Sequence, residues 1–337
     1  MRLRVGLVGL GSAWETRHRP ALRALSDRFE VRAVYEHVAH RAEQAAREFD
    51  ATAVDGFRAI AQREDIDAIL MLGRQWYGAL PVMAACDAGK AVYSVAGLDL
   101  DPERARRIRD RIEESGIAFM AEFPCRQAPA TLRLKELIAT RLGAPQLLFC
   151  HRRDSAEKPK AGAICESAAA SSAHSLIELV DWCRYVVGQE PTSVFGLMHQ
   201  RSSQDSDDYK MMNLDFSPSG KLGHGPTAQI SSGRYVPANW PEAVTFRPPA
   251  ALQVVCENGI AFIDLPASLV WFDTAGRHME SLESERPVGE QLLVQFYRAV
   301  TSLVRNASGI EDAYRAQSIV MLAKASHEQG RRMPIEP

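Results

Sequence analysis

The sequence predicts an α/β domain with a doubly wound parallel sheet, followed by an α+β domain with a largely antiparallel, open-faced sheet. Up to about residue 122, short apolar runs alternate with helical patterns, as in parallel sheets whose strands are joined by helices. A glycine-rich turn ends the first apolar run. Beyond about residue 122 the alternation gives way to strands separated by turn residues, which is typical of an antiparallel sheet.

The opening stretch, Leu3 to Glu36, has the order strand, glycine-rich turn, helix and strand. The first apolar run reaches Gly9, and the second strand, Val31 to Glu36, ends in a carboxylate. This is the pattern of the first βαβ unit of a Rossmann-type, dinucleotide-binding domain. Gly9 permits the tight turn, and Gly11 lets the backbone approach a pyrophosphate. The N–H groups and the dipole of the following helix would hold that anion.

Glu36 indicates which dinucleotide this turn would bind. It lies about 25 residues beyond Gly11, where an acid accepts hydrogen bonds from the ribose hydroxyls of the adenosine. A carboxylate there repels a 2′-phosphate, so NAD is the expected cofactor, although Arg41 leaves room for NADP. The remaining predicted cofactor contacts in the turn are Ser12, Ala13 and Trp14.

Trp14 stands where the glycine pattern has its third small residue. A tryptophan does not allow the close helix–strand packing that a small residue gives there. The loop is therefore either one residue longer than usual, or the helix is displaced. A Gly-x-Gly turn also occurs in ordinary αβ loops, so the cofactor prediction depends on the strand, the helix and the acid together.

Composition excludes several classes of function. The 337 residues suffice for two domains, which we place at 1–122 and 123–337. A net charge of -2 shows no basic excess for nucleic acid, and no apolar run approaches the roughly 20 residues of a membrane span. The six cysteines are scattered, which indicates free thiols rather than disulfides or a zinc site. No cleavable signal segment precedes the first strand, so we expect a cytoplasmic protein. No residues have the spacing of a metal site, so we expect no metal.

The remaining elements follow in order along the chain. In the first domain, helices are predicted over Ala39–Phe49, Phe57–Arg63, Pro81–Ala88 and Pro102–Ser115, and strands over Ala53–Val54, Asp67–Leu72, Ala91–Val95 and Ile117–Met120. In the second domain, helices are predicted over Thr131–Thr140, Ser172–Val187, Gly289–Val304 and Ile310–Gln329, with strands over Gln146–Arg152 and between Thr192 and Phe272. The C-terminal helix is expected to pack back on the first domain.

With both domains in view, the chain resembles the Gfo/Idh/MocA oxidoreductases, the glucose–fructose oxidoreductase and inositol dehydrogenase group. The resemblance covers nearly the full length and rests on the glycine turn, Asp67–Leu72, Ala88–Val92, Arg126 with Lys135–Ile138, Glu311–Val320 and Ser326–Pro334. It implies an NAD(P)-dependent oxidoreductase that transfers hydride to or from a sugar, cyclitol or related polyol or keto compound. It also implies a homo-oligomer formed through the sheet of the second domain.

The chain departs from the family where the chemistry lies. After the strand Ala91–Val95 the family has Glu-Lys-Pro, whose lysine assists proton transfer, and Ala96 replaces that lysine here. The turn after Asp67–Leu72 also differs from the family's Thr-Pro-Asn-x-x-His. By resemblance, three of its residues line the cofactor's edge: Gly73, Arg74 and Trp76.

By resemblance, the family motif Asp-x-Gly-x-His-x-x-Asp falls on the helix Ser172–Val187. There His174 replaces its first Asp, Glu178 replaces its His, and Asp181 keeps its final Asp. At about 100° per residue these three share one stripe of the helix. A hydrogen bond from His174 to Glu178 would orient the imidazole and raise its pKa. The stripe is either the solvated face of an amphipathic helix or, by resemblance, the face that lines the substrate cleft. In the second case all three are candidate catalytic residues.

Two other residues are weaker candidates for substrate contact. Arg126 matches a family arginine near the cleft, but a surface salt bridge explains it equally well. Tyr93 is either a hydrogen-bond donor in the site or an ordinary strand residue.

Three functional classes remain open. The first is a dehydrogenase or reductase in which His174 is the acid/base. The second is a redox-neutral lyase or hydrolase that keeps NAD bound and forms a transient ketone, with Glu178 abstracting the proton beside the carbonyl. The third is a non-catalytic NAD-binding sensor that has lost the family lysine.

Overall fold

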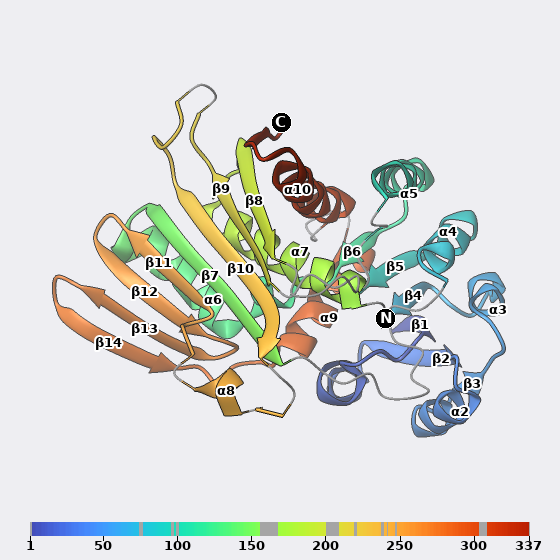
Figure 1. The fold of residues 1–337 in the computed structure, drawn as a ribbon. Helices are drawn as coiled ribbons and strands as arrows, with labels where there is room; N and C mark the ends of the chain where they lie inside the picture. Colours follow the sequence, from blue (N-terminus) through green and yellow to red (C-terminus); the bar gives the residue numbers. More distant parts are fainter. Residues whose placement is uncertain are drawn as a thin grey trace. The chain divides into compact units, whose positions relative to one another are not determined.

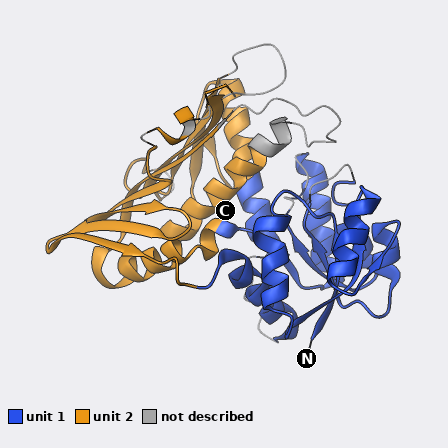
Figure 2. Ribbon diagram, turned by 90° about the horizontal axis from the view of Figure 1, so that it is seen from below, with its two compact units in different colours: residues 1–124, 286–317 blue, residues 125–285, 318–337 orange. Residues whose placement is uncertain are grey.

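The computed structural model describes residues 2–73, 77–95, 98, 101–155, 168–199, 209–218, 221–236, 239–240, 242–246, 248–302 and 309–336. The chain divides into two compact units (Figure 2). Unit 1 comprises residues 1–124 and 286–317, and unit 2 comprises residues 125–285 and 318–337. Unit 1 therefore takes in a segment from late in the chain.

Unit 1 contains a six-stranded parallel sheet in the order β3-β2-β1-β4-β5-β6 (Figure 1). The strands are β1 (Leu3–Val8), β2 (Phe29–Tyr35), β3 (Thr52–Ala53), β4 (Ala68–Met71), β5 (Ala91–Ser94) and β6 (Phe119–Ala121). The strand order reverses between β1 and β4, and ligands of such sheets bind at this switch point, beyond the carboxyl ends of the strands. The predicted doubly wound parallel sheet is confirmed.

Helices cover both faces of this sheet. One face shares a core with the π-helical turn η1 (Trp14–His18), α1 (Arg19–Ala24), α2 (Ala39–Glu48) and α9 (Val288–Thr301). On the other face pack α3 (Phe57–Gln62) and α4 (Leu80–Asp87), with α5 (Pro102–Ser115) beside α4. The approach is close, because a Cβ on Gly6 of β1 would lie 2.2 Å from Cγ2 of Ile60. Burial on both faces explains why β4 is apolar throughout its length and why every residue of β5 is buried.

Unit 2 contains a nine-stranded sheet in the order β14-β13-β12-β11-β7-β10-β9-β8-β15. Its strands are β7 (Pro145–Ser155), β8 (Ser193–His199), β9 (Tyr209–Asp215), β10 (Thr227–Val236), β11 (Leu252–Cys256), β12 (Gly259–Asp264), β13 (Ser268–Asp273), β14 (Gly276–Ser281) and β15 (Met333–Pro334). Among the described pairs, β7 and β10 run parallel and the others antiparallel. The predicted α+β domain with a largely antiparallel sheet is confirmed.

One face of the nine-stranded sheet is covered by α6 (Pro129–Leu137) and α7 (Ala168–Val187) (Figure 1). Fully buried Trp182 of α7 donates a hydrogen bond to Oγ1 of Thr131 of α6, at 2.9 Å. The later part of α10 (Ile310–Gln329) packs on β8, where a Cβ on Gly196 would lie 2.1 Å from the carbonyl oxygen of Ala323. The short elements of this unit and its border are η2 (Pro124–Gln127), η3 (Ile138–Leu142) and α8 (Glu242–Thr245).

The opposite face of the nine-stranded sheet exposes large apolar side chains across its width. Leu147, Leu197, Phe272 and Met279 lie on β7, β8, β13 and β14 and are 40–69% exposed. Within the described ranges, no helix has both the length and the apolarity that a bilayer crossing requires.

Candidate functional site

The glycine turn lies at the switch point of the unit 1 sheet. Gly9 and Gly11 have φ angles of 69° and 58°, a region that favours glycine. A Cβ on Gly11 would lie 1.9 Å from the carbonyl oxygen of Leu72, just beyond β4. Gly73 packs against the same turn, since its Cβ would lie 3.0 Å from the Gly11 nitrogen. The turn therefore leaves no room for side chains at Gly11 and Gly73.

Glu36 is placed at the turn by the end of β2. Its side chain is buried, and its Oε2 accepts a hydrogen bond from the Leu10 N–H at 2.7 Å. Its Oε1 accepts from the His37 N–H at 2.9 Å. Arg41 is exposed on the first turn of α2. A tight glycine turn with a fixed carboxylate at its edge fits a dinucleotide, whose pyrophosphate needs the backbone and whose ribose needs the acid.

The helix after the glycine turn begins with the π-helical turn η1. The N–H groups of Arg17 and His18 both donate to the Ala13 carbonyl, at 2.9 and 3.2 Å. A π turn is wider than an α turn, so η1 takes up one more residue than an α-helical start would. The Trp14 indole is buried in the core with its ring 5.9 Å from that of Phe49, so a cofactor contact of Trp14 would come from its backbone.

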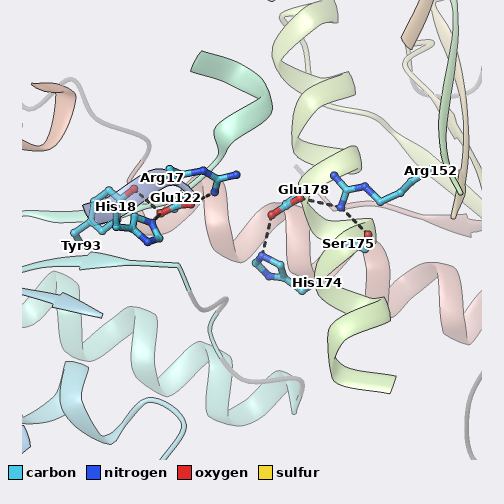
Figure 3. Close-up of polar contacts among 8 residues, drawn as sticks. All are labelled: Arg17, His18, Tyr93, Glu122, Arg152, His174, Ser175 and Glu178. Carbon is cyan, nitrogen blue, oxygen red and sulfur yellow. Dashed lines mark hydrogen bonds and ion pairs between the residues drawn. The ribbon is translucent and has the colours of Figure 1, made fainter. Parts of the chain in front are cut away.

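Glu122 follows β6 directly in the sequence. Its buried carboxylate contacts side chains of both η1 and β5 (Figure 3). Its Oε2 accepts a hydrogen bond from the Tyr93 hydroxyl at 2.6 Å and pairs with His18 Nε2 at 2.7 Å, while its Oε1 accepts from Arg17. Burial raises the pKa of Tyr93 well above its usual range, so the hydroxyl stays a donor. Tyr93, predicted as a weak substrate contact, thus lies in the core with its hydroxyl on Glu122.

We did not single out Arg17, His18 or Glu122 from the sequence, because they form no motif. The one available signal was an acid at the carboxyl end of an apolar strand, Glu122 after Phe119–Ala121. Its three partners could be recognised only from the packing.

On α7, His174 and Glu178 lie together as predicted from their spacing of four (Figure 3). His174 Nε2 is 3.1 Å from Glu178 Oε1. Arg152 of β7 donates from Nη1 to Glu178 Oε2 at 3.0 Å and to the Ser175 hydroxyl at 2.6 Å. The His174 and Glu178 side chains are only 14% and 16% exposed, so this part of the stripe is not a solvated face.

Asp181, the third residue of the stripe, belongs to a different set of contacts. Its side chain is 1% exposed and makes a two-point ion pair with Arg126. Arg184 approaches the same carboxylate at 3.5 Å, and the Arg126 guanidinium lies over the Tyr185 ring at 5.3 Å. This pairing suits a carboxylate that holds η2 on α7 better than one that exchanges a proton. At 12% exposed, Arg126 does not form a surface salt bridge.

The predicted site residues thus form four sets. The turn residues with Glu36 and Gly73 lie in unit 1, as does Tyr93 on its own cluster, and the two α7 sets lie in unit 2. Arg74, Trp76 and Ala96 lie outside the described residues. Among the residues that are described, no His, Cys, Asp or Glu side chains form a group of three suited to a metal ion.

We expect the Glu122 carboxylate to stabilise the fold less at acidic pH than at neutral pH. Burial alone raises the pKa of its carboxyl, but the His18 hydrogen bond and the charges of His18 and Arg17 outweigh burial, and the pKa lies below its ordinary value of 4.5. A carboxyl with a depressed folded-state pKa stabilises the protein above its unfolded-state pKa and loses that effect as the pH falls through the folded-state pKa.

We therefore expect Glu122→Gln to lower the melting temperature at about pH 7, by a difference that shrinks below about pH 4.5. Differential scanning fluorimetry from about pH 7 to pH 3 measures it. Glu114→Gln, at an exposed carboxylate of α5, is the control without such a trend. A difference that stays constant into acid would show that the charge of Glu122 is not what stabilises the fold.

Comparison with known proteins finds a family match over the first part of the chain and a similar fold over its full length. Residues 3–123 match the model of a family described as "Oxidoreductase family, NAD-binding Rossmann fold". A putative myo-inositol dehydrogenase from Sinorhizobium meliloti 1021 has 21% identity and a TM-score of 0.76, covering 99% of this chain and 100% of that chain. Levoglucosan dehydrogenase, in complex with NADH and levoglucosan, has 16% identity and a TM-score of 0.82, covering 100% of both chains. An NAD binding oxidoreductase from Klebsiella pneumoniae has 16% identity and a TM-score of 0.82, covering 100% of this chain and 99% of that chain. No curated protein matches the chain.

Proposed function

We propose that this chain, whose residues 3–123 match the model of the Gfo/Idh/MocA oxidoreductase family, is an NAD-dependent dehydrogenase or reductase of a sugar, cyclitol or related polyol or keto compound. The hydrogen bond between His174 and Glu178 carries the proposal, because it provides a proton carrier in a chain whose sequence lacks the family lysine. The substrate class is supported by the two neighbours whose names specify levoglucosan and myo-inositol.

The glycine turn of unit 1 would hold the dinucleotide. Gly9, Gly11 and the backbone from Ser12 to Trp14 would bind the pyrophosphate, and Glu36 would bind the adenosine ribose. When bound, NAD supplies the acceptor or donor of the hydride.

His174 would handle the proton of the substrate oxygen. With Glu178 as the acceptor of its Nε2–H, the imidazole is fixed in the tautomer whose Nδ1 carries the lone pair. In alcohol oxidation Nδ1 takes the hydroxyl proton as the carbonyl forms, and in reduction it returns the proton. The imidazolium that forms is stabilised by the adjacent carboxylate.

Glu178 orients His174 in this scheme and does not itself abstract a proton. Its Oε1 pairs with His174, and its Oε2 is bound by Arg152. Glu178 would have to release His174 or Arg152 to contact a substrate proton, which weighs against the lyase or hydrolase alternative. The two arginines of β7 also bind protein groups, since Arg153 donates to the Ala243 and Phe246 carbonyls. These contacts favour an uncharged substrate over an anionic one.

For the cofactor, we expect Glu36→Ala to weaken NADH binding by about 10–100-fold and NADPH binding much less, because a carboxylate binds the 2′-hydroxyl of NADH and repels the 2′-phosphate of NADPH. The lost hydrogen bonds to the Leu10 and His37 N–H groups affect both nucleotides alike. Equilibrium titration of the nucleotide fluorescence measures both. Glu43→Ala, at an exposed site on α2, is the matched control. If neither nucleotide binds the wild type below millimolar concentration, the cofactor assignment is wrong.

For the reaction, we expect His174→Ala to lower turnover by at least about 10²-fold with NADH affinity unchanged, the usual cost of removing a general acid/base. A panel of polyols and keto sugars, including levoglucosan and myo-inositol, supplies the substrates. His327→Ala, at an exposed histidine of α10, is the control. Full activity of His174→Ala would move the chemistry to other residues, among them Arg126.

Two observations separate the alternatives. NAD that copurifies and is retained through turnover favours the redox-neutral class, because an internally recycled cofactor need not dissociate. NADH binding without turnover of any compound in the panel favours the sensor.

We also propose a homo-oligomer formed through the open face of the unit 2 sheet, supported by its exposed apolar side chains. Light scattering coupled to size exclusion should give a multiple of the chain mass. Leu147→Glu, at the centre of the face, should yield monomers, while Leu222→Glu, an exposed site outside the strands, should not. A monomeric wild type would contradict the proposal.

A further inference from the structure

We propose that Glu122 is a positioning residue for the dinucleotide: it fixes the π-helical turn after the glycine loop and thereby sets cofactor affinity. The inference rests on the proposed NAD-binding function. It goes beyond that function by assigning a role to buried charges that lie outside the glycine turn itself.

Glu122 is anchored to β5 through both its backbone and its side chain. Its own N–H donates to the Ser94 carbonyl at 2.9 Å, which continues the β5–β6 pairing. The Tyr93 hydroxyl, from β5, holds its Oε2. The carboxylate therefore has a fixed position relative to β5 and β6.

The same carboxylate holds η1 through two consecutive residues. Arg17 binds Oε1 and His18 binds Oε2, so the end of the π turn is held at both oxygens. α9 packs closely on this turn as well, since a Cβ on Gly289 would lie 2.7 Å from the Arg17 carbonyl oxygen. The turn is thus held by side-chain contacts in addition to its own backbone hydrogen bonds.

A π turn needs such support more than an α-helical turn does. In a π turn each N–H donates to the carbonyl five residues earlier instead of four, and such turns occur in proteins mainly as single turns. The N–H groups that would bind the pyrophosphate lie at the start of η1, at Ser12 and Ala13 just before it and at Trp14, its first residue. Hydrogen bonds weaken steeply with misalignment, so a shift of η1 would be felt as a loss of nucleotide affinity.

Tyr93 provides the comparison that separates positioning from general stability. It shares Oε2 with His18 but comes from the sheet, so its removal takes a donor from Glu122 without freeing η1. Tyr93→Phe keeps the ring in the core. His18→Gln keeps an N–H donor at the distance of Nε2, whereas His18→Ala removes it.

We expect His18→Ala and Glu122→Gln to weaken NADH binding by about 10-fold or more, measured by fluorescence titration well below each melting temperature. His18→Gln should recover affinity to within about threefold of wild type, and Tyr93→Phe should stay within the same range even where it lowers the melting temperature as much. Hydrogen exchange of the cofactor-free protein should accelerate over residues 12–18 in the first two variants alone.

Unchanged NADH affinity in both His18→Ala and Glu122→Gln would overturn the inference, as would a Tyr93→Phe loss equal to theirs. If His18→Ala does not fold, Glu122→Gln and His18→Gln still decide it. A wild type that binds no dinucleotide would instead defeat the proposed function, and this inference with it.

Discussion

The approach of the backbone at Gly11 to the end of β4 is the constraint on which unit 1 depends. The Leu72 carbonyl occupies the place where any other residue would carry its Cβ. Strands β1 and β4 must be neighbours for this contact to exist, and their adjacency is what opens the sheet at its switch point. The candidate site at this edge therefore combines the backbone of the turn with the Glu36 carboxylate, which follows β2 directly.

Beyond the turn, each unit contains buried or half-buried carboxylates that are paired with several donors. Burying a carboxylate is costly unless it is paired and hydrogen-bonded. Glu122 meets this condition with donors from η1 and β5, Asp181 with Arg126, and Glu178 with Arg152 and His174. Each set links elements far apart in the sequence. The positions of the candidate functional side chains are thus fixed by charge pairing as much as by apolar packing.

What could be predicted from the sequence was local in character. The alternation of strands and helices and the glycine turn follow from short-range patterns, and the structure confirms them. The predicted resemblance to the family agrees with the match of residues 3–123. The His174–Glu178 contact was also predicted, because a spacing of four on a helix determines it. The partners of Glu122 were not, since His18 lies 104 positions away and Tyr93 lies 29 positions away. The same holds for Arg152 on Glu178 and for Asp181 on Arg126, which depend on how α7 packs on β7 and η2. The indole of Trp14 showed that the glycine pattern was altered, but only the fold showed that a π turn takes up the change.

The inclusion of residues 286–317 in unit 1 has a consequence for synthesis of the chain. α9 contributes Leu292, Leu293, Val294 and Phe296 to the core of the first unit. Unit 2 likewise needs residues 318–337, which include part of α10 and the edge strand β15. Because a ribosome delivers the chain from the N-terminus, neither unit has its whole core until the last helices emerge. Until α9 has been synthesised, one apolar face of the sheet of unit 1 is only partly covered. A nascent chain of this kind depends on chaperones or on fast late folding to avoid aggregation, and a truncation that removes α9 would damage the unit at the opposite end of the sequence.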